Sequence, residues 1–374
     1  MWKIHRSKLW LPDLTGLKTD GITDLSTLAR IAVRTGYTPY DPAKSIEHNS
    51  AGTFDIRLEG GHYTDISNWD AGEASDLVTE DAGHSIARCY DDWPTGLVDT
   101  IDLDATWVSD VDNMPQITVA TGNRHNGTAE SGFFIRSPSN TRIIISRTDF
   151  AYVNGVEFQA SNAAISNCLY SLADTDQFDA DNLIVHDFPG TSIVGVHTNA
   201  DVSTWRNCAV WDWMGGRRIA GTGNNGTFYN CVFFESGNDT DTILLRDATF
   251  YNCVAFSSST MVNGVFFAGC LGDYNAGSDA SAPGANSNHN MSLNDLLFVS
   301  TTGGSEDFHI TTESLLRDEG FAFGGMFGTD VDGDAWASPP AIGFDEVVAV
   351  GDQNPQLVDG GLVNRGLVNS GVVE

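Results

Sequence analysis

The sequence has few positive charges and no long apolar run. Lysine and arginine number 19 among 374 residues, against 50 aspartates and glutamates, so the net charge is −31. Because phosphate binding requires clustered cations, this balance argues against nucleic acid and anionic membranes as partners of the main body. No run of about eighteen apolar residues occurs, so we expect no membrane insertion.

Close cysteine pairs and a secretory leader are also missing. The N-terminal cations Lys3, Arg6 and Lys8 are followed by an apolar run over 9–11 only, which is too short for the core of a signal peptide. We therefore expect synthesis in a cytoplasm without a signal peptide. In that setting the six cysteines are expected to serve packing rather than disulfides, and no C-x2-C pair indicates zinc.

The charges that are present are segregated along the chain. Residues 1–44 carry seven cations and four acids, net +3, so residues 45–374 carry −31 − 3 = −34. This favours an N-terminal arm that anchors on an acidic surface through Lys3, Arg6 and Lys8; the alternative is an arm that contacts its own body. With 38 aspartates and only 4 lysines, the composition is typical of a halophilic protein, or of an ordinary acidic surface.

A repeat is visible around the cysteines. Five of them occur in ISNCLY, WRNCAV, FYNCVF, FYNCVA and FAGCLG, with spacings of 40, 23, 22 and 17 residues, and four follow asparagine directly. A period near 22 with the alternation of β-strands predicts a solenoid. The 39 glycines and 11 prolines agree with many turns and short strands.

Stacking of such repeats predicts a structural ladder. Strand periodicity places each cysteine on the inner face, and the asparagine before it lies at a bend, where its amide bonds the coils above and below. In the 40-residue gap, Asn182 and Leu183 stand for the missing pair. The predicted ladder residues are Asn167, Asn207, Asn230, Asn252, Cys168, Cys208, Cys231, Cys253 and Cys270.

Four regions follow from this organisation. Residues 1–44 form the basic arm, with a short helix over 24–36 that caps the solenoid, and residues 45–130 form a β-rich part with long loops. Residues 131–346 form the solenoid. Residues 347–374 form an extended tail with a five-residue GLVNx repeat, which we expect to dock onto a partner or another subunit; the alternative is a disordered tail. The apolar docking residues of the tail are Leu362, Val363, Leu367 and Val368.

Two C-terminal stretches resemble known proteins. Residues 294–320 and 328–346 are similar to the closing coils of right-handed parallel β-helix proteins, and residues 89–97 and 120–133 resemble segments common in β-helix proteins of tailed viruses and prophages. The matching residues are Asp307, Phe308, Ser314, Asp318, Gly320, Thr329, Asp330, Asp332, Gly333, Ile342, Gly343 and Glu346. The resemblance implies an all-β, right-handed parallel β-helix of about ten coils of ~22 residues, and a virion role.

The best candidate contact patch lies in WDWMGGRRIAG. Trp211, Trp213, Arg217 and Arg218 combine two aromatic rings with two of the few cations of the body, which suits carbohydrate stacking or a subunit contact. The alternative is that one tryptophan belongs to the core and the arginines pair with nearby acids.

No catalytic or cofactor motif is present. No H-x-H or H-E-x-x-H spacing and no nucleotide-binding glycine pattern occurs, and the aspartate clusters are too common here to identify an active site. Asp330, Asp332 and Asp334 form a weak candidate for a cation such as calcium. The EF-hand pattern fails there because Ala335 and Ala341 replace the required glycine and glutamate, so a turn is the alternative.

These observations favour a non-enzymatic structural protein of a tailed-virus particle, either a head decoration or turret or a tail spike that contacts the host surface. We expect a homotrimer or pentamer located in the virion, with other virion proteins as partners and host glycan as a further one. The alternatives are a tailspike-like polysaccharide depolymerase or lyase, and a cell-surface adhesin. The adhesin is the least favoured because it requires export and an anchor.

Overall fold

The computed structural model describes residues 2–5, 9–11, 47–50, 63, 65–79, 84–137, 143–159, 167–171, 177–187, 194–198, 202–211, 218–220, 226–235, 245–257, 265–266, 269–323 and 329–347. Within these residues the protein is mostly β-structure with few helices, which confirms the all-β class. The described helices are α3 (Ile66–Glu73) and α4 (Leu293–Leu296).

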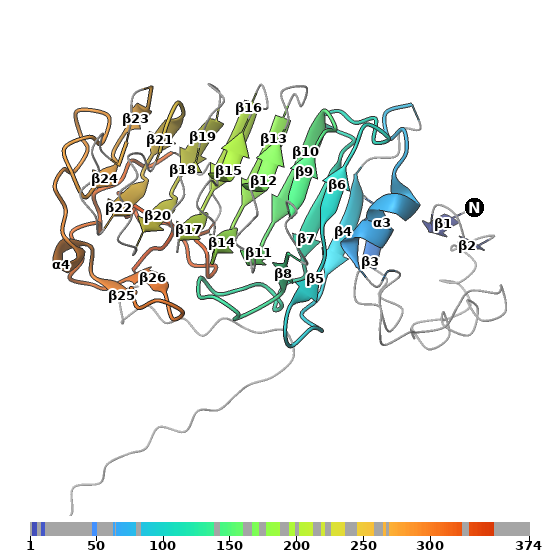
Figure 1. Ribbon diagram of the computed structural model, residues 1–374, viewed down its shortest axis with the longest axis horizontal. Helices are drawn as coiled ribbons and strands as arrows, with labels where there is room; N and C mark the ends of the chain where they lie inside the picture. Colours follow the sequence, from blue (N-terminus) through green and yellow to red (C-terminus); the bar gives the residue numbers. More distant parts are fainter. Residues whose placement is uncertain are drawn as a thin grey trace, which may run out of the picture.

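Three long sheets make up most of the molecule (Figure 1). The first sheet contains β3 (Glu47–Ser50), β4 (Ser85–Cys89), β7 (Pro115–Val119), β10 (Phe150–Asn154), β13 (Gln177–Asp181), β16 (Val202–Arg206), β19 (Gly226–Tyr229), β21 (Thr249–Tyr251) and β23 (Leu271–Asp273). The second contains β5 (Leu97–Val98), β8 (Phe134–Arg136), β11 (Glu157–Gln159), β14 (Ile184–His186), β17 (Ala209–Trp211), β20 (Val232–Glu235), β22 (Val254–Ser257) and β24 (Ala276–Gly277). The third contains β6 (Ile101–Leu103), β9 (Ile144–Ser146), β12 (Asn167–Ser171), β15 (Val194–Thr198) and β18 (Arg218–Ala220).

The chain visits these sheets in a fixed order. From β4 to β18 each pass adds one strand to the first, then the second, then the third sheet, and every pairing within these passes is parallel. Beyond β18 the described part of the third side is reduced to a single bridge between Leu245 and Phe266. Among the described strands of the three long sheets, only β3, at the N-terminal edge of the first sheet, runs antiparallel to its neighbour.

The extent of the parallel region differs from the sequence-based expectation. Eight parallel strands of the first sheet run from Ser85 to Asp273, whereas about ten coils were expected within 131–346. The first passes therefore lie inside the region 45–130. The sequence repeat does not reveal these early strands, because they contain no Asn-Cys pair of the kind that marks the later passes.

From β10 onward, the corner between the first and second sheets contains one left-handed residue in each pass. This conformation is open to glycine and tolerated by asparagine, whose short amide side chain bonds locally. The residues with positive φ at this corner are Gly155 (75°), Asn182 (53°), Asn207 (53°), Asn230 (51°), Asn252 (53°) and Tyr274 (57°). The repeated asparagine is therefore first a backbone requirement of the corner.

The asparagine side chains at this corner are joined into a ladder. Each asparagine after the first donates from Nδ2 to the Oδ1 of the asparagine one pass earlier, at 3.3, 3.2, 3.3 and 3.0 Å. The members are Asn154, Asn182, Asn207, Asn230 and Asn252. These contacts satisfy the side-chain amides of Asn207, Asn230 and Asn252, which are buried.

Asn207, Asn230 and Asn252 thus form the bonds expected of the ladder, but Asn167 does not belong to it. Asn167 begins β12 in the third sheet, where its backbone lies opposite Val194. Asn182 and Asn154 take the earlier positions instead. The Asn-Cys dipeptide in ISNCLY is therefore the start of a strand. The dipeptide alone does not distinguish a corner from a strand.

The predicted cysteine column is limited to three residues. Cys208, Cys231 and Cys253 are buried directly after their ladder asparagines, and each thiol donates to the carbonyl two residues before it, at 3.1–3.3 Å. Cys270 instead precedes β23 and is partly exposed, one strand length before the corner. Cys168 lies in β12 of the third sheet, so its backbone is also outside the column.

The interior between the sheets is filled by aromatic side chains from the first sheet. Trp205 lies 5.6 Å from Phe178 and 5.8 Å from Phe228, and Phe228 stacks on Phe250 at 5.1 Å between ring centroids. All four are buried. Because register repeats in every pass, rings on adjacent strands meet at stacking distance, which adds to the free energy of burial.

At the N-terminal end of the rod, α3 lies against β4 and β6 (Figure 1). Asp65 caps this helix by accepting from the amide of Asn68, while Ile66 and Trp69 are fully buried. The helix that the sequence predicts over 24–36 lies outside the described residues.

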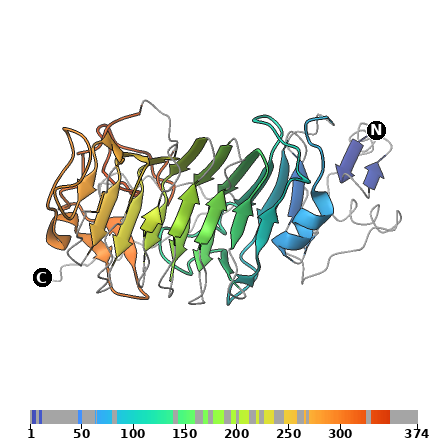
Figure 2. The ribbon, with the colours of Figure 1, turned by 45° about the horizontal axis from the view of Figure 1, so that its top comes forward.

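The outer face of the second sheet is covered by the C-terminal part of the chain. We call residues 288–323 and 329–347 the C-terminal return; it includes α4 and the antiparallel pair β25 (Phe298–Ser300) and β26 (Asp307–Ile310). Figure 2 shows its orange and red segments doubling back beside the yellow and green strands. Phe308 contacts Trp211 and Phe234 across this interface, at 5.2 and 5.1 Å between ring centroids.

This arrangement corrects the expectation that residues 294–346 form closing coils. They do not extend the parallel sheets but lie along the side of strands already formed. The physical reason is visible in β20 and β22, all of whose residues are buried. A parallel strand with apolar side chains on both faces requires a cover on each, and the return supplies the outer one.

Among the described residues, no helix is long and apolar enough to cross a membrane.

We predict that Asn230→Ala lowers the free energy of unfolding by about 3 kcal/mol, because two buried ladder bonds are lost and their partners stay unsatisfied. Denaturant unfolding followed by circular dichroism measures the change. Asn290→Ala is the matched control, because Asn290 is exposed and also has positive φ (56°). Its free energy of unfolding should fall by only about 1 kcal/mol, which is the backbone strain of alanine in this conformation. Equal losses in the two variants would contradict the ladder.

We also predict that Phe308→Ala, at a fully buried ring, costs about 4 kcal/mol and releases the C-terminal return. Limited proteolysis should then cut between residues 298 and 323 well before the parallel sheets are cut. Phe321→Ala, at a ring that is 46% exposed, serves as control and should leave the digestion pattern unchanged. A resistant return in the Phe308 variant would show that Phe308 does not hold it.

Candidate functional site

Of the predicted contact patch, Trp211 is not on the surface. This ring is fully buried, stacked on His186 at 4.9 Å between centroids and covered by Phe308 of the return. Trp211 is therefore a core residue, because its strand is enclosed on both faces. Arg218 begins β18, where its backbone pairs with Val194. Trp213 and Arg217 lie outside the described residues.

The anchoring residues are largely beyond the described structure. Lys3 lies in β1 (Trp2–His5), which pairs in antiparallel register with β2 (Leu9–Leu11). Arg6 and Lys8 lie outside the described residues. The same holds for the tail residues Leu362, Val363, Leu367 and Val368. Anchoring by either end therefore stays a prediction.

The outer face of the first sheet carries an ordered polar cluster. Asp181 accepts from Tyr152 Oη at 2.8 Å and from Arg206 Nε at 2.5 Å and Nη2 at 3.1 Å. The three residues come from adjacent strands β10, β13 and β16 and point away from the core. Burial raises the pKa of Asp181, an effect that the Arg206 guanidinium opposes.

Aromatic rings continue this face toward the C-terminal end. Tyr229 and Tyr251 lie on neighbouring strands and stack at 5.6 Å between centroids, and Phe323 of the return packs edge-on against both. Tyrosine rings at one-strand spacing next to a carboxylate–guanidinium pair are the groups that contact sugar rings and their hydroxyls in carbohydrate-binding proteins. The sequence alone does not indicate these residues, because only the strand register brings them onto one face.

A second cluster is buried beneath the return. Glu157 is completely buried and bonds His186 Nε2 at 2.8 Å, while Asp187 lies 3.3 Å from His186 Nδ1. Both oxygens of Glu157 also accept from the amide of Glu130, at 2.9 Å each. The Glu130 amide thus joins the loop before β8 to Glu157 of the second sheet. Trp211 covers the imidazole of His186, so the ion pair between His186 and Glu157 has a structural role.

Burial lowers the pKa of both buried histidines here, but carboxylate partners reverse the direction for one of them. Burial alone would lower the pKa of His186, but the hydrogen bonds to Asp187 and Glu157 outweigh it and raise the pKa to about 9. His125 is buried without a carboxylate partner and bonds the carbonyl of Asn182 at 2.8 Å, so burial lowers its pKa to about 4. The first histidine is therefore charged and the second neutral at pH 7.

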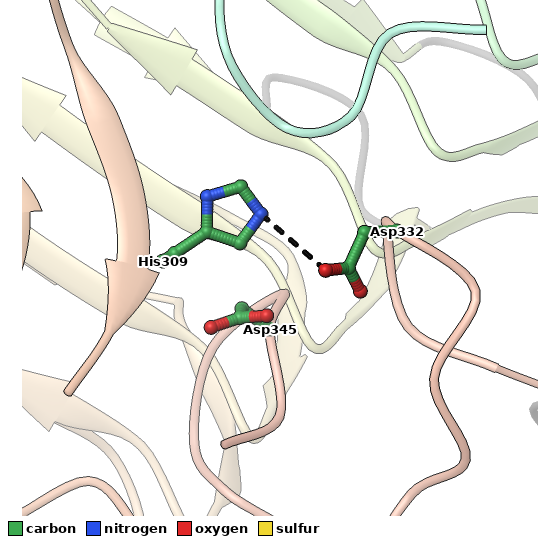
Figure 3. A group of neighbouring side chains, drawn as sticks. All are labelled: His309, Asp332 and Asp345. Atoms are coloured by element: carbon green, nitrogen blue, oxygen red, sulfur yellow. Dashed lines mark ion pairs between the residues drawn. The ribbon is translucent and has the colours of Figure 1, made fainter. Parts of the chain in front are cut away.

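A third cluster lies where loops of the return meet, and it is the best candidate site of the molecule. Figure 3 shows the His309 imidazole, on β26, facing the carboxylates of Asp332 and Asp345 from two separate loops. One ligand-type atom from each of the three residues lies within 4.8 Å of the other two. His309 Nε2 is 3.9 Å from Asp332 Oδ2, which is too long for a hydrogen bond.

The weak cation candidate from the sequence adjoins this cluster. Asp330, Asp332 and Asp334 also bring three carboxylate oxygens within 4.8 Å of one another, so Asp332 belongs to both groups. Asp330, however, is occupied: its Oδ1 accepts from the amides of Gly333 and Asp334, and its Oδ2 accepts from that of Glu346. Burial, together with the neighbouring Asp332, raises the pKa of Asp330 to about 9. The turn role expected as the alternative is thus present in its hydrogen bonds.

His309 and Asp345 were missed by sequence reasoning. They lie far apart in the chain and show none of the short spacings typical of metal ligands on one element. The relevant signal was indirect: both fall in the two stretches that resemble β-helix proteins. Burial raises the pKa of Asp345 to about 7, although His309 opposes this shift.

The pKa of His186 makes a testable prediction about stability. Its folded value lies above the unfolded value of about 6.5, so its stabilisation is complete below pH 6.5 and is lost as pH rises through 9. Between pH 6 and pH 10 the free energy of unfolding of the unaltered protein should fall by about 3 kcal/mol more than that of His186→Gln. Parallel pH profiles of the two proteins would contradict the ion pair with Glu157.

Comparison with known proteins adds no family assignment: no family model, curated protein or solved structure matches this chain.

Proposed function

We propose that the three sheets are the sides of a right-handed parallel β-helix, and that the chain is a non-enzymatic structural protein of a tailed-virus particle. In this proposal the helix is a rod that projects from the particle as a head decoration, turret or tail spike. Right-handed winding is expected because parallel strands joined by crossovers take that hand in nearly all proteins.

One observation carries the proposal: the chain adds strands to the three sheets in the same order over successive passes. Seven steps between the eight parallel strands of the first sheet, at about 4.8 Å each, give a rod of about 34 Å. Its interior is closely packed and its second side is covered by the return. Such a rod presents side chains at fixed spacing without moving parts, which suits a projecting structural element.

The charge distribution supports the same role. The body carries −34 and the arm over 1–44 carries +3, so the arm is the part that an acidic surface would attract. We propose that the arm or the GLVNx tail joins the rod to other virion proteins. A rod with exposed sides also favours a symmetric assembly, and we propose a homotrimer or pentamer.

A polysaccharide depolymerase is the second candidate, favoured by the outer face of the first sheet. Asp181, Arg206 and Tyr152 form one polar cluster there, with Tyr229 and Tyr251 farther along. A carboxylate beside a guanidinium is the kind of group that serves acid–base chemistry on sugars. Host glycan is thus a partner in either candidate, as a ligand or as a substrate.

The virion role is tested with antibodies against the purified chain. We expect gold-labelled antibodies to mark projections on particles of a virus that encodes it, and mass spectrometry to find a fixed ratio of the chain to the shell protein. Finding the chain only in the lysate, with unlabelled particles, would contradict the proposal.

The enzymatic candidate predicts release of oligosaccharides when the chain is incubated with host glycan. Asp181→Asn should abolish that release, whereas Asp318→Asn, at an exposed position on the return, should not alter it. A chain that binds glycan without releasing products would favour the structural role over the enzyme.

A further inference from the structure

We propose that His309, Asp332 and Asp345 bind a divalent first-row transition-metal ion, and that this ion fastens the three segments of the C-terminal return to one another. The site is independent of the virion role, because it rests only on the geometry of the return.

His309 is oriented for this task. Its Nδ1 bonds Asp307 Oδ1 at 2.5 Å, so the neutral ring has its lone pair on Nε2, the nitrogen that faces Asp332. A carboxylate on the second nitrogen is the arrangement that fixes the tautomer and raises the basicity of metal-binding histidines. Gly127 packs against the same edge of the ring: a Cβ there would lie 2.5 Å from Cε1 and 2.7 Å from Nε2. The ring therefore has little freedom to turn away.

Asp345 supplies a buried carboxylate with an open position. The residue is only 4% exposed, and its Oδ2 accepts from the amide of Ile310 at 2.8 Å. Among the described residues, no donor reaches its other oxygen. The lone pairs of this oxygen are therefore available to an ion, and the side chain that carries it faces His309 and Asp332 (Figure 3).

The separations suit ligands of a common ion. Bonds of about 2.0–2.2 Å to zinc place two ligands about 3.3 Å apart. The 3.9 Å between His309 Nε2 and Asp332 Oδ2 exceeds this by a small margin. The contacts of Asp345 with the other two residues lie within 4.8 Å, so the three side chains would need to approach one another by up to about 1.5 Å. Asp332 is exposed, so its side chain has room for this movement.

The surroundings leave negative charge to be compensated. The described carboxylates near the site are Asp307, Asp330, Asp332, Asp334, Asp345 and Glu346. His309 is the one described side chain among them that can carry positive charge, and no described lysine or arginine forms an ion pair with any of these carboxylates. A divalent cation between Asp332 and Asp345 would reduce the repulsion.

The donor set selects the kind of ion. Imidazole nitrogen suits zinc and its neighbours, whereas calcium prefers six to eight oxygen ligands. The adjacent all-oxygen group is less suited to calcium, because both oxygens of Asp330 are held by backbone amides. We therefore assign a transition metal to the mixed group, with water completing its coordination.

Calorimetric titration of the full, chelator-treated chain with Zn²⁺ tests the proposal. We expect one ion per chain and binding at least tenfold weaker in Asp345→Asn and in His309→Gln. Asp345→Asn is nearly isosteric and keeps an oxygen for the Ile310 amide, so it should fold; circular dichroism checks this. Asp334→Asn is the matched control, because Asp334 belongs to the all-oxygen group alone. It should change the affinity less than twofold.

Two further readouts separate the outcomes. Zn²⁺ should shift the ¹⁵N resonance of His309 Nε2 and slow proteolysis of the return in the unaltered chain but not in Asp345→Asn. The proposal is overturned if Zn²⁺ does not bind, if Asp334→Asn weakens binding as much as Asp345→Asn does, or if Ca²⁺ binds at this place and Zn²⁺ does not.

Discussion

From β10 onward, each pass of the chain turns from the first sheet into the second through one left-handed residue, and the regular part of the structure depends on that corner. Asparagine meets the requirement twice, through its backbone and through an amide that bonds the asparagine of the preceding pass. Because the same corner repeats, it fixes the register of both sheets at once. Cys208, Cys231 and Cys253 then lie in one buried column, and the aromatic rings of the first sheet stack on one another.

A second constraint follows from the second sheet. Its later strands carry apolar side chains on both faces, so the outer face must be covered within the same chain or by a partner. The return meets this need through Phe308 on Trp211 and Phe234. The same folding back brings His309, Asp332 and Asp345 together, so the best candidate site is a consequence of how the sheet is covered.

The repeat could be predicted from the sequence because it is local. The Asn-Cys pairs at 208, 231 and 253 share spacing, burial and corner, and the period near 22 gave the correct all-β class. Asn167 shows the limit: the same dipeptide lies in a strand of the third sheet and not at the corner. The early passes, which lack the dipeptide, were assigned to a separate region.

The site residues could not be found in this way, because their proximity is not local. The sequence left Trp211 either in a surface patch or in the core, because nothing in the sequence shows that the return covers it. His309 and Asp345 come together only through that covering. Sequence periodicity reports which face of a strand a residue occupies, but not which distant segment lies on that face.

The most direct measurement is an experimental density map of the chain at side-chain resolution. It should show Asn182, Asn207, Asn230 and Asn252 bonded in succession at one corner, with Phe308 of the return against Trp211. A map in which these asparagines lie on unrelated turns, or in which residues 307–310 lie away from the second sheet, would contradict the stacked passes on which everything above depends.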